Sequence, residues 1–345
     1  MRAGHFWTMT VTMAWAIGGL AVSGPVGADE PRLTPVAVQN ALAKTIPLLQ
    51  LSGAAYREQR ECFSCHHQGL VAVTVARARH FGVAVDRKQA RDQSKFAHAY
   101  FKGREKRIRA GEGVPGGAYN GGYALWGLHA DGWTPDSVTR DLVKYLKTKH
   151  RHDGSWRIRT HRPPLEDSHF TATALSLRGL QLYAGPDEAK DLGERIPRVR
   201  AWLLKAKAKT NEDRAFRLLG LAWAGVEIGE VRKIGKKLVK RQRTDGGWSQ
   251  IKDLESDSYA TGQALVALKT AGVLKSSDAA YQRGCRFLLK TQNPDGSWLV
   301  RSRSKPFQTY FESKFPHGKS QFISICGTCW ATMALLETLP ASKAR

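Results

Sequence analysis

The chain has 345 residues, with 54 Lys and Arg against 30 Asp and Glu, which gives a net charge of +24. Five cysteines are too few for a disulfide-built scaffold, so the small cysteine-rich class is excluded. The basic residues are spread along the whole chain, which favours an anionic membrane surface or an acidic glycan as a partner. A solvated basic surface without a partner explains the charge equally well.

Residues 1–28 are typical of a secretory signal peptide. Arg2 and His5 precede a largely apolar stretch, and small residues before and at Ala28 suit signal peptidase. An uncleaved membrane anchor is the alternative, but it needs about 20 apolar residues, and threonines and glycines interrupt this run. The sequence therefore predicts an exported protein, periplasmic or extracellular after cleavage, for which nucleic acid is an unexpected partner.

The next feature is the stretch "CFSCHHQ", in which Cys62, Cys65 and His66 form the pattern C-x-x-C-H. This order is typical of covalently bound c-type haem, with thioethers to both cysteines and His66 as the iron ligand. Zinc bound by cysteines and His66 is a second interpretation. Disulfides or free thiols are the third, because an exported protein meets an oxidising environment.

A repeated phrase divides the rest of the chain. "HRHDGSW" ends at Trp156, "QRTDGGW" at Trp248 and "QNPDGSW" at Trp298, and the last two tryptophans are 50 residues apart. Such a period indicates stacked units, none of which buries its apolar face alone. Each phrase ends a helical stretch with turn residues.

Helices rich in alanine and leucine follow these phrases, as in "DSYATGQALVALKTAG". They begin with capping residues, end near glycine and contain little Lys or Glu, so they are expected to be inner helices. Charged stretches such as "YLKTK" and "LVKRQ" are expected to be outer helices. Weaker copies bring the inner helices to six, beginning near residues 67, 120, 168, 213, 257 and 328.

The stretch from Arg283 to Trp298, "RGCRFLLKTQNPDGSW", resembles the QW repeat of squalene and hopene cyclases. Gln242, Gly246 and Trp248 keep its key positions, whereas His150 replaces the glutamine before Trp156. The resemblance implies an all-α fold, an (α/α)6 toroid of the terpene cyclase and protein prenyltransferase superfamily, over residues 29–340. It also implies an isoprenoid or another apolar ligand in a central cavity.

The known catalytic motifs of that superfamily are not matched. No D-x-D-D acid motif occurs, and its nearest substitutes, Asp257 and the pair Glu166 and Asp167, are expected to begin helices. The D-x-C zinc pair of prenyltransferases is missing, because position 259 is tyrosine. The sequence therefore predicts that no inner-helix carboxylate protonates an alkene.

A second pair of cysteines, Cys326 and Cys329, is expected at the start of the sixth inner helix. They follow an inserted loop at about residues 299–326, which is expected to fold over one mouth of the ring. In a closed ring the first and sixth inner helices are neighbours, so these thiols could join Cys62 and Cys65 around zinc. Met333, with His169 and His317 as rivals, is the candidate sixth ligand of a haem.

Three functions therefore remain open. The first is an exported toroid that carries a c-type haem and has a redox or lipid-binding role. The second is a cyclase-like or prenyltransferase-like enzyme that acts on an isoprenoid, either with zinc or without it. The third is a non-catalytic scaffold that binds membranes or glycans.

Overall fold

The computed structural model describes Met1, residues 33–306 and residues 308–340. Apart from Met1, the signal segment predicted at residues 1–28 lies outside the described residues. The remainder belongs to one unit, Pro31–Arg345, which is described by itself below. None of the described helices combines the length and the hydropathy that crossing a bilayer requires.

Six helices form an inner layer in which each packs against the next and the last packs against the first. The first of them is a π-helical turn, η1 (Cys65–Leu70), continued by α2 (Val71–His80). The others are α5 (Gly117–Ala130), α7 (His169–Tyr183), α9 (Asn211–Trp223), α11 (Ser258–Thr270) and α13 (Gln321–Leu336). The ring predicted from the repeats is therefore closed.

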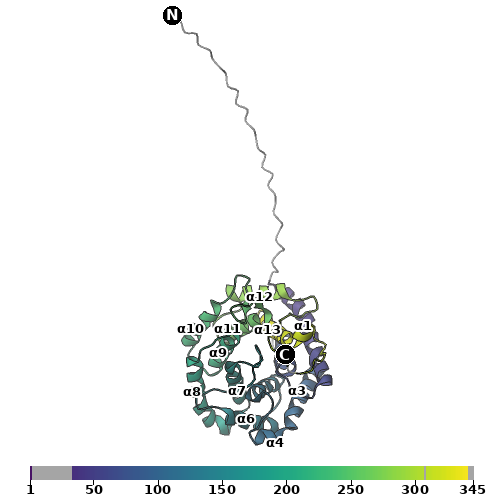
Figure 1. Cartoon of the computed structure of the whole chain (residues 1–345), viewed down its shortest axis with the longest axis vertical. Helices are drawn as coiled ribbons and strands as arrows, with labels where there is room; N and C mark the ends of the chain where they lie inside the picture. Colours follow the sequence, from purple (N-terminus) through teal and green to yellow (C-terminus); the bar gives the residue numbers. More distant parts are fainter. Residues whose placement is uncertain (2–32, 307, 341–345) are drawn as a thin grey trace. The chain divides into compact units, whose positions relative to one another are not determined.

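Six outer helices alternate with the inner ones along the chain and surround them (Figure 1). They are α1 (Pro35–Gln59), α3 (Arg87–Lys102), α6 (Ser137–Lys149), α8 (Ala189–Lys205), α10 (Ile228–Val239) and α12 (Ala279–Thr291). Minor elements are α4 (Glu105–Arg109), η2 (Pro186–Glu188), η3 (Gly318–Ser320) and the strands β1 (Trp248–Ser249) and β2 (Ser256–Asp257), which pair antiparallel. The (α/α)6 fold class is confirmed.

Sequence composition explains which helices lie inside. The outer helix α10 buries only Val231, Gly235 and Leu238, whereas α13 buries every residue from Ile323 to Leu336. A one-sided apolar stripe suits a helix with one solvent face, and an apolar surface all round suits a buried helix. Small residues let the inner helices approach closely: a Cβ added at Gly262 of α11 would lie 2.4 Å from the Trp330 carbonyl carbon of α13.

The three tryptophan phrases form the same turn. In each, the indole Nε1 donates to the carbonyl ten residues earlier, at 2.7 Å for Trp156, 2.9 Å for Trp248 and 2.8 Å for Trp298. In each, the tryptophan backbone N–H also donates to a threonine hydroxyl of the following inner helix. The tryptophan thus ties one outer helix to the next inner helix.

The last of these turns closes the ring. Gln292 Nε2 donates to the Ala41 carbonyl and, at 2.9 Å, to Thr45 Oγ1, both on α1, and also to the Gly296 carbonyl. Thr45 Oγ1 in turn donates to the Gly296 carbonyl at 2.7 Å. The final outer turn is therefore bonded to the first outer helix across 251 residues of sequence.

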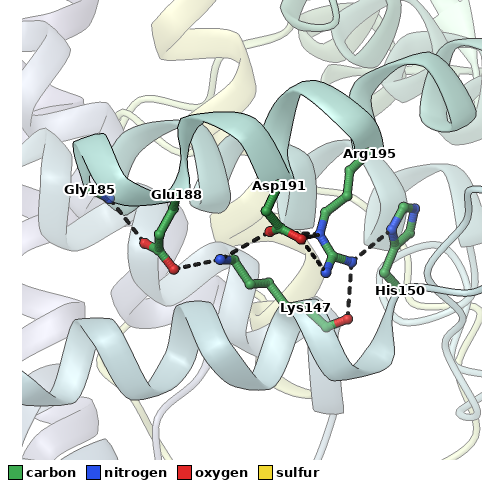
Figure 2. Close-up of polar contacts among 6 residues, drawn as sticks. All are labelled: Lys147, His150, Gly185, Glu188, Asp191 and Arg195. Carbon is green, nitrogen blue, oxygen red and sulfur yellow. Dashed lines mark hydrogen bonds and ion pairs between the residues drawn. The ribbon is translucent and has the colours of Figure 1, made fainter.

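In the first turn, His150 takes the place of the glutamine by a different contact. Its ring stacks on Trp156 with centroids 4.1 Å apart, and its Nδ1 accepts from Arg195 Nη1 of α8 at 3.1 Å. Figure 2 shows Arg195 held by Asp191, which also pairs with Lys147 of α6. An ion-pair network therefore joins α6 to α8 at the departure from the glutamine pattern.

The boundaries at the end where the inner helices begin, hereafter the N-terminal mouth, need corrections. The sixth inner helix begins at Gln321 rather than near 328, so the inserted loop ends at residue 320 rather than 326. Asp257 caps α11 as expected, with its Oδ1 accepting from the Ala260 N–H at 2.8 Å. Glu166 and Asp167 do not begin α7, because they pair with Arg162 and His161 and Ser168 is the N-cap.

Candidate functional site at the N-terminal mouth

The centre of the inner layer is filled by aromatic side chains. Tyr119 and Tyr123 contact each other with ring centroids 5.1 Å apart, and the chain of contacts continues through Trp126 and Trp330 to Phe216. Two cavities lie at the N-terminal mouth, where residues of the loop 157–167 and of the segments 302–306 and 308–310 contribute to their walls.

The first, called the acid cavity, has a volume of about 400 Å³ and lies at the starts of α7, α9 and α11. Its lining includes Phe170, Trp202, Glu212, Tyr259, Gln263 and Arg303. Lys207 and Lys209 also line it, as do Asp167 and Asp213, so apolar rings share the cavity with charged groups of both signs. This composition suits a ligand with an apolar body and a polar or anionic end.

Glu212 is buried, and three side chains of the inner layer hold its carboxyl group. Thr171 Oγ1 donates to Oε1, and Tyr259 Oη and Gln263 Nε2 donate to Oε2, each at 2.6 Å. Burial raises the pKa of Glu212 to about 7, although these three hydrogen bonds lower it. Both hydroxyls can also accept a hydrogen bond, so the protonated carboxyl keeps its partners.

Glu212 is a functional candidate that the sequence reasoning missed. It stands in "TNEDRAF", directly before Asp213, where acidic residues are expected to cap a helix. Asp213 does take part in a capping box with Thr210. The only local signal was that Glu212 is a second acidic residue in a helix start where Asp213 alone completes the cap. The burial of Glu212 depends on its partners in α7 and α11.

The second cavity, called the loop cavity, has a volume of about 450 Å³ and lies between residues 162–166, the segments 302–306 and 308–310, and the start of α13. Cys65 and His66 line it, together with Leu165, Tyr310 and Phe322. Two of the three residues of the C-x-x-C-H pattern therefore face one mainly apolar space.

His66 contacts a neighbouring side chain through Nδ1, whereas none of the described residues is hydrogen-bonded to its Nε2. Its Nδ1 contacts His67 Nδ1, and its ring packs against Phe322 with centroids 5.4 Å apart. His67 is fully buried, with Nε2 bonded to Ser313 Oγ at 3.0 Å. Burial lowers the pKa of His66 to about 3, so its ring is neutral at physiological pH.

The other predicted ligands are not all brought together. Cys62 Sγ lies 3.2 Å from the Tyr56 hydroxyl and is absent from the lining of the loop cavity. Cys326 and Cys329 are buried inside α13, and all five cysteines are free. Among residues 33–306 and 308–340, no group of three or more His, Cys, Asp or Glu side chains is placed to hold a metal ion.

The candidate sixth ligands of a haem also lie apart from His66. Met333 is buried near the end of α13, with its sulfur 3.9 Å from Arg77 Nη1. His169 Nδ1 faces the Ile158 N–H, and His317 Nε2 is bonded to Ser297 Oγ at 2.8 Å. The structure therefore places none of the three against the His66 ring.

Comparison with known proteins supports the fold. No protein-family model matches the chain. Lanosterol synthase erg7A of Aspergillus fumigatus is 34% identical over 112 residues, which are 32% of this chain and 14% of that protein. Alpha-onocerin synthase LCD of Lycopodium clavatum is 28% identical over 105 residues, which are 30% of this chain and 13% of that protein. The similarity thus spans a small part of the length of these relatives.

Solved structures are similar over most of the chain. The type II terpene cyclase MstE from Scytonema, without ligand, has a TM-score of 0.55 at 16% identity, covering 87% of this chain and 98% of that chain. A variant of MstE in complex with geranylgeranyl dihydroxybenzoate, its substrate, has a TM-score of 0.56 at 16% identity, covering 89% and 99%. The chain therefore has a terpene cyclase-like fold.

Proposed function

We propose that the protein is a terpene-cyclase-like enzyme that transfers a proton between Glu212 and an isoprenoid bound in the acid cavity. The observation that carries this proposal is the position of Glu212, a buried carboxyl with a pKa of about 7 in the wall of a cavity with aromatic sides. A group whose pKa is close to the working pH can both donate and accept a proton. The similarity to type II terpene cyclases supports an isoprenoid substrate.

The chemistry is an isomerisation. The proton leaves the Glu212 carboxyl for a double bond or an epoxide of the substrate, and the resulting cation closes on a second double bond. A proton is then lost to the Glu212 carboxylate, so that no co-reactant is consumed. Phe170, Trp202 and Tyr259 would exclude water and place aromatic faces beside the cation. In this proposal a single carboxyl held through Thr171, Tyr259 and Gln263 takes the place of the missing D-x-D-D motif. The proposal therefore departs from the expectation, drawn from the sequence, that no inner-helix carboxylate protonates an alkene.

The test is incubation of the purified protein with squalene, 2,3-oxidosqualene and geranylgeranyl diphosphate, followed by mass spectrometric analysis for cyclic isomers. We expect at least one cyclic product, and we expect Glu212→Gln to abolish it. Glu255→Gln is the matched control, because Glu255 is exposed and outside the acid cavity. Product formation that survives Glu212→Gln, or no product from any of these substrates, would contradict the proposal.

A second candidate function rests on a separate observation, the shared exposure of Cys65 and His66 to the loop cavity. Each cysteine of the C-x-x-C-H pattern would add its S–H across one haem vinyl group, which consumes no oxidant, and His66 would be the iron ligand through Nε2. Cys62 fits only after turning from Tyr56 toward the cavity. A bound haem would supply electron transfer.

The haem proposal is tested on protein produced together with a haem-maturation system. We expect a mass increase of one haem that survives acid denaturation. His66→Ala should change the absorption spectrum, whereas His67→Ala should change it little, because His67 is held by Ser313 inside the protein. Unchanged protein mass would exclude covalent haem without affecting the proposal for Glu212.

A further inference from the structure

A third cavity lies at the opposite end of the inner layer, hereafter the C-terminal mouth. It has a volume of about 360 Å³ and is lined by the C-terminal halves of α2, α5, α7, α9 and α11. Most of its wall is apolar or aromatic, with Trp126, Leu219, Trp223 and Val266 among the lining residues. We call it the arginine cavity, because Arg77 and Arg178 also line it.

Arg178 is a partly buried cation without an anionic partner. Within residues 33–306 and 308–340, none of its nitrogens has a hydrogen-bond acceptor or an ion-pair partner, and its Nε is buried and unsatisfied. Its guanidinium carbon lies 5.5 Å from the ring centroid of Trp223. Burial lowers the pKa of Arg178, but a guanidinium stays protonated at any physiological pH.

This arrangement leaves hydrogen-bonding capacity unused. A buried charge is normally paired, because removal from water without a partner is unfavourable. The contact with Trp223 offsets part of that loss, yet it gives the guanidinium N–H donors no oxygen acceptor. An oxygen anion in the cavity would satisfy these donors.

The other residues around the arginine cavity indicate what kind of molecule carries the anion. The C-terminal ends of the inner helices carry partial negative charge, so an anion is stable there only beside cations. Arg77 is the second cation, although Glu337 already binds its Nη2 at 2.9 Å. His129 also lies near Arg178, whose positive charge contributes to lowering the His129 pKa. The tryptophans and aliphatic side chains suit an apolar chain.

We infer that the arginine cavity binds a single-chain amphiphile whose anionic head, a carboxylate or a phosphate, pairs with Arg178 while its apolar chain contacts Trp126 and Trp223. This site is separate from the acid cavity, which opens at the other mouth. The inference therefore does not depend on proton transfer by Glu212.

The experiment measures binding of dodecanoate, dodecyl phosphate and dodecanol by calorimetry and tryptophan fluorescence. We expect both anions to bind and dodecanol to bind at least about tenfold more weakly, since dodecanol has no charge to pair with the Arg178 guanidinium. Vesicles of anionic phospholipid distinguish a membrane headgroup from a free amphiphile: competition with dodecanoate indicates that the same cavity takes the headgroup, and its absence restricts the site to free amphiphiles.

Variants locate the site. Arg178→Met should weaken dodecanoate binding about tenfold or more, Arg178→Lys should retain part of it, and Glu212→Gln should leave it unchanged. Arg140→Met is the control, because Arg140 is an exposed arginine of α6 outside the cavity. Circular dichroism verifies folding, and Arg178→Lys replaces Arg178→Met if the latter does not fold. Equal binding of dodecanol and dodecanoate, or dodecanoate affinity unchanged in both Arg178 variants, would overturn the inference.

Discussion

The two mouths of the inner layer differ in their connections and in their charges. The longest connections, residues 150–168, 240–257 and 292–320, lie at the N-terminal mouth, whereas at the C-terminal mouth the chain makes short ones, such as 81–86, 131–136 and 224–227. The long connections contain the tryptophan turns and contribute to the lining of two cavities. At the other mouth, the arginine cavity is lined by residues of the helices themselves.

Different physical effects also set the ionisation state of the charged groups at the two mouths. At the N-terminal mouth the helix dipoles favour a carboxylate, yet burial dominates and favours the neutral form of Glu212. At the C-terminal mouth the dipoles favour cations, which fits Arg77 and Arg178. Burial therefore decides the protonation of the Glu212 carboxyl, whereas the Arg178 guanidinium, which cannot lose its proton, keeps its charge.

The largest expected effect compares two glycines with positive φ. A Cβ at Gly296 would lie 2.6 Å from Lys44 Cβ and 2.8 Å from the Lys44 carbonyl carbon on α1, whereas a Cβ at Gly132, in a short turn of the C-terminal mouth, meets nothing within 4 Å. Urea unfolding should show a loss of about 4 kcal/mol or more for Gly296→Ala. Gly132→Ala should lose only about 1 to 2 kcal/mol from backbone strain. Equal losses would contradict the ring closure at Gly296.

The second prediction concerns the pH dependence of stability. The pKa of Glu212 in the folded protein, about 7, is above the usual 4.5, so its contribution is fully present below pH 4.5 and is lost as the pH rises to 7. The difference corresponds to about 3 kcal/mol of unfolding free energy. Unfolding measured from pH 4 to 8 should show this loss in the wild type relative to Glu212→Gln. Parallel profiles of the two proteins would mean that Glu212 ionises normally.

The third prediction compares two residues at equivalent positions of the tryptophan turns. Gln292→Ala removes the hydrogen bonds to Ala41, Thr45 and Gly296 and should lower the unfolding free energy by about 2 kcal/mol. His150→Ala removes the stacking on Trp156 and one contact of Arg195, which Asp191 still holds, so about 1 kcal/mol is expected. A larger loss of unfolding free energy for His150→Ala would show that the contacts between α6 and α8 stabilise the ring more than the contacts of Gln292 with α1.

The smallest effect should have the opposite sign. Arg178→Met removes a partly buried cation that has no hydrogen-bond acceptor among the described residues, so the ligand-free protein should gain about 1 kcal/mol of unfolding free energy. The gain should be larger at pH 5 than at pH 8, because the Arg178 charge contributes to lowering the His129 pKa and the variant removes this repulsion of protonated His129. Thermal unfolding at the two pH values measures it, and a loss of stability would show that the contact with Trp223 outweighs the burial of the charge.

Several features of the fold were predictable because they depend on local patterns. The three phrases ending at Trp156, Trp248 and Trp298 marked repeating units, and the small-residue helices between them were correctly expected inside. The start of α13 was missed by seven residues, because Gln321 resembles a loop residue and becomes buried only by bonding the Phe311 carbonyl. The pair Glu166 and Asp167 was wrongly expected to begin a helix, because their basic partners lie in an irregular loop.

The sequence by itself determined the helical units and their closure into six pairs, since hydrophobic period, capping residues and turn residues act over a few positions. Only the tertiary structure decided the chemistry of the two mouths. Glu212 becomes a buried acid because Thr171, Tyr259 and Gln263 come from two other helices. Arg178 stays unpaired within the described part of the chain, because none of the acceptors there lies within hydrogen-bond distance of it. Protonation and pairing depend on burial and on distant neighbours, which no local pattern records.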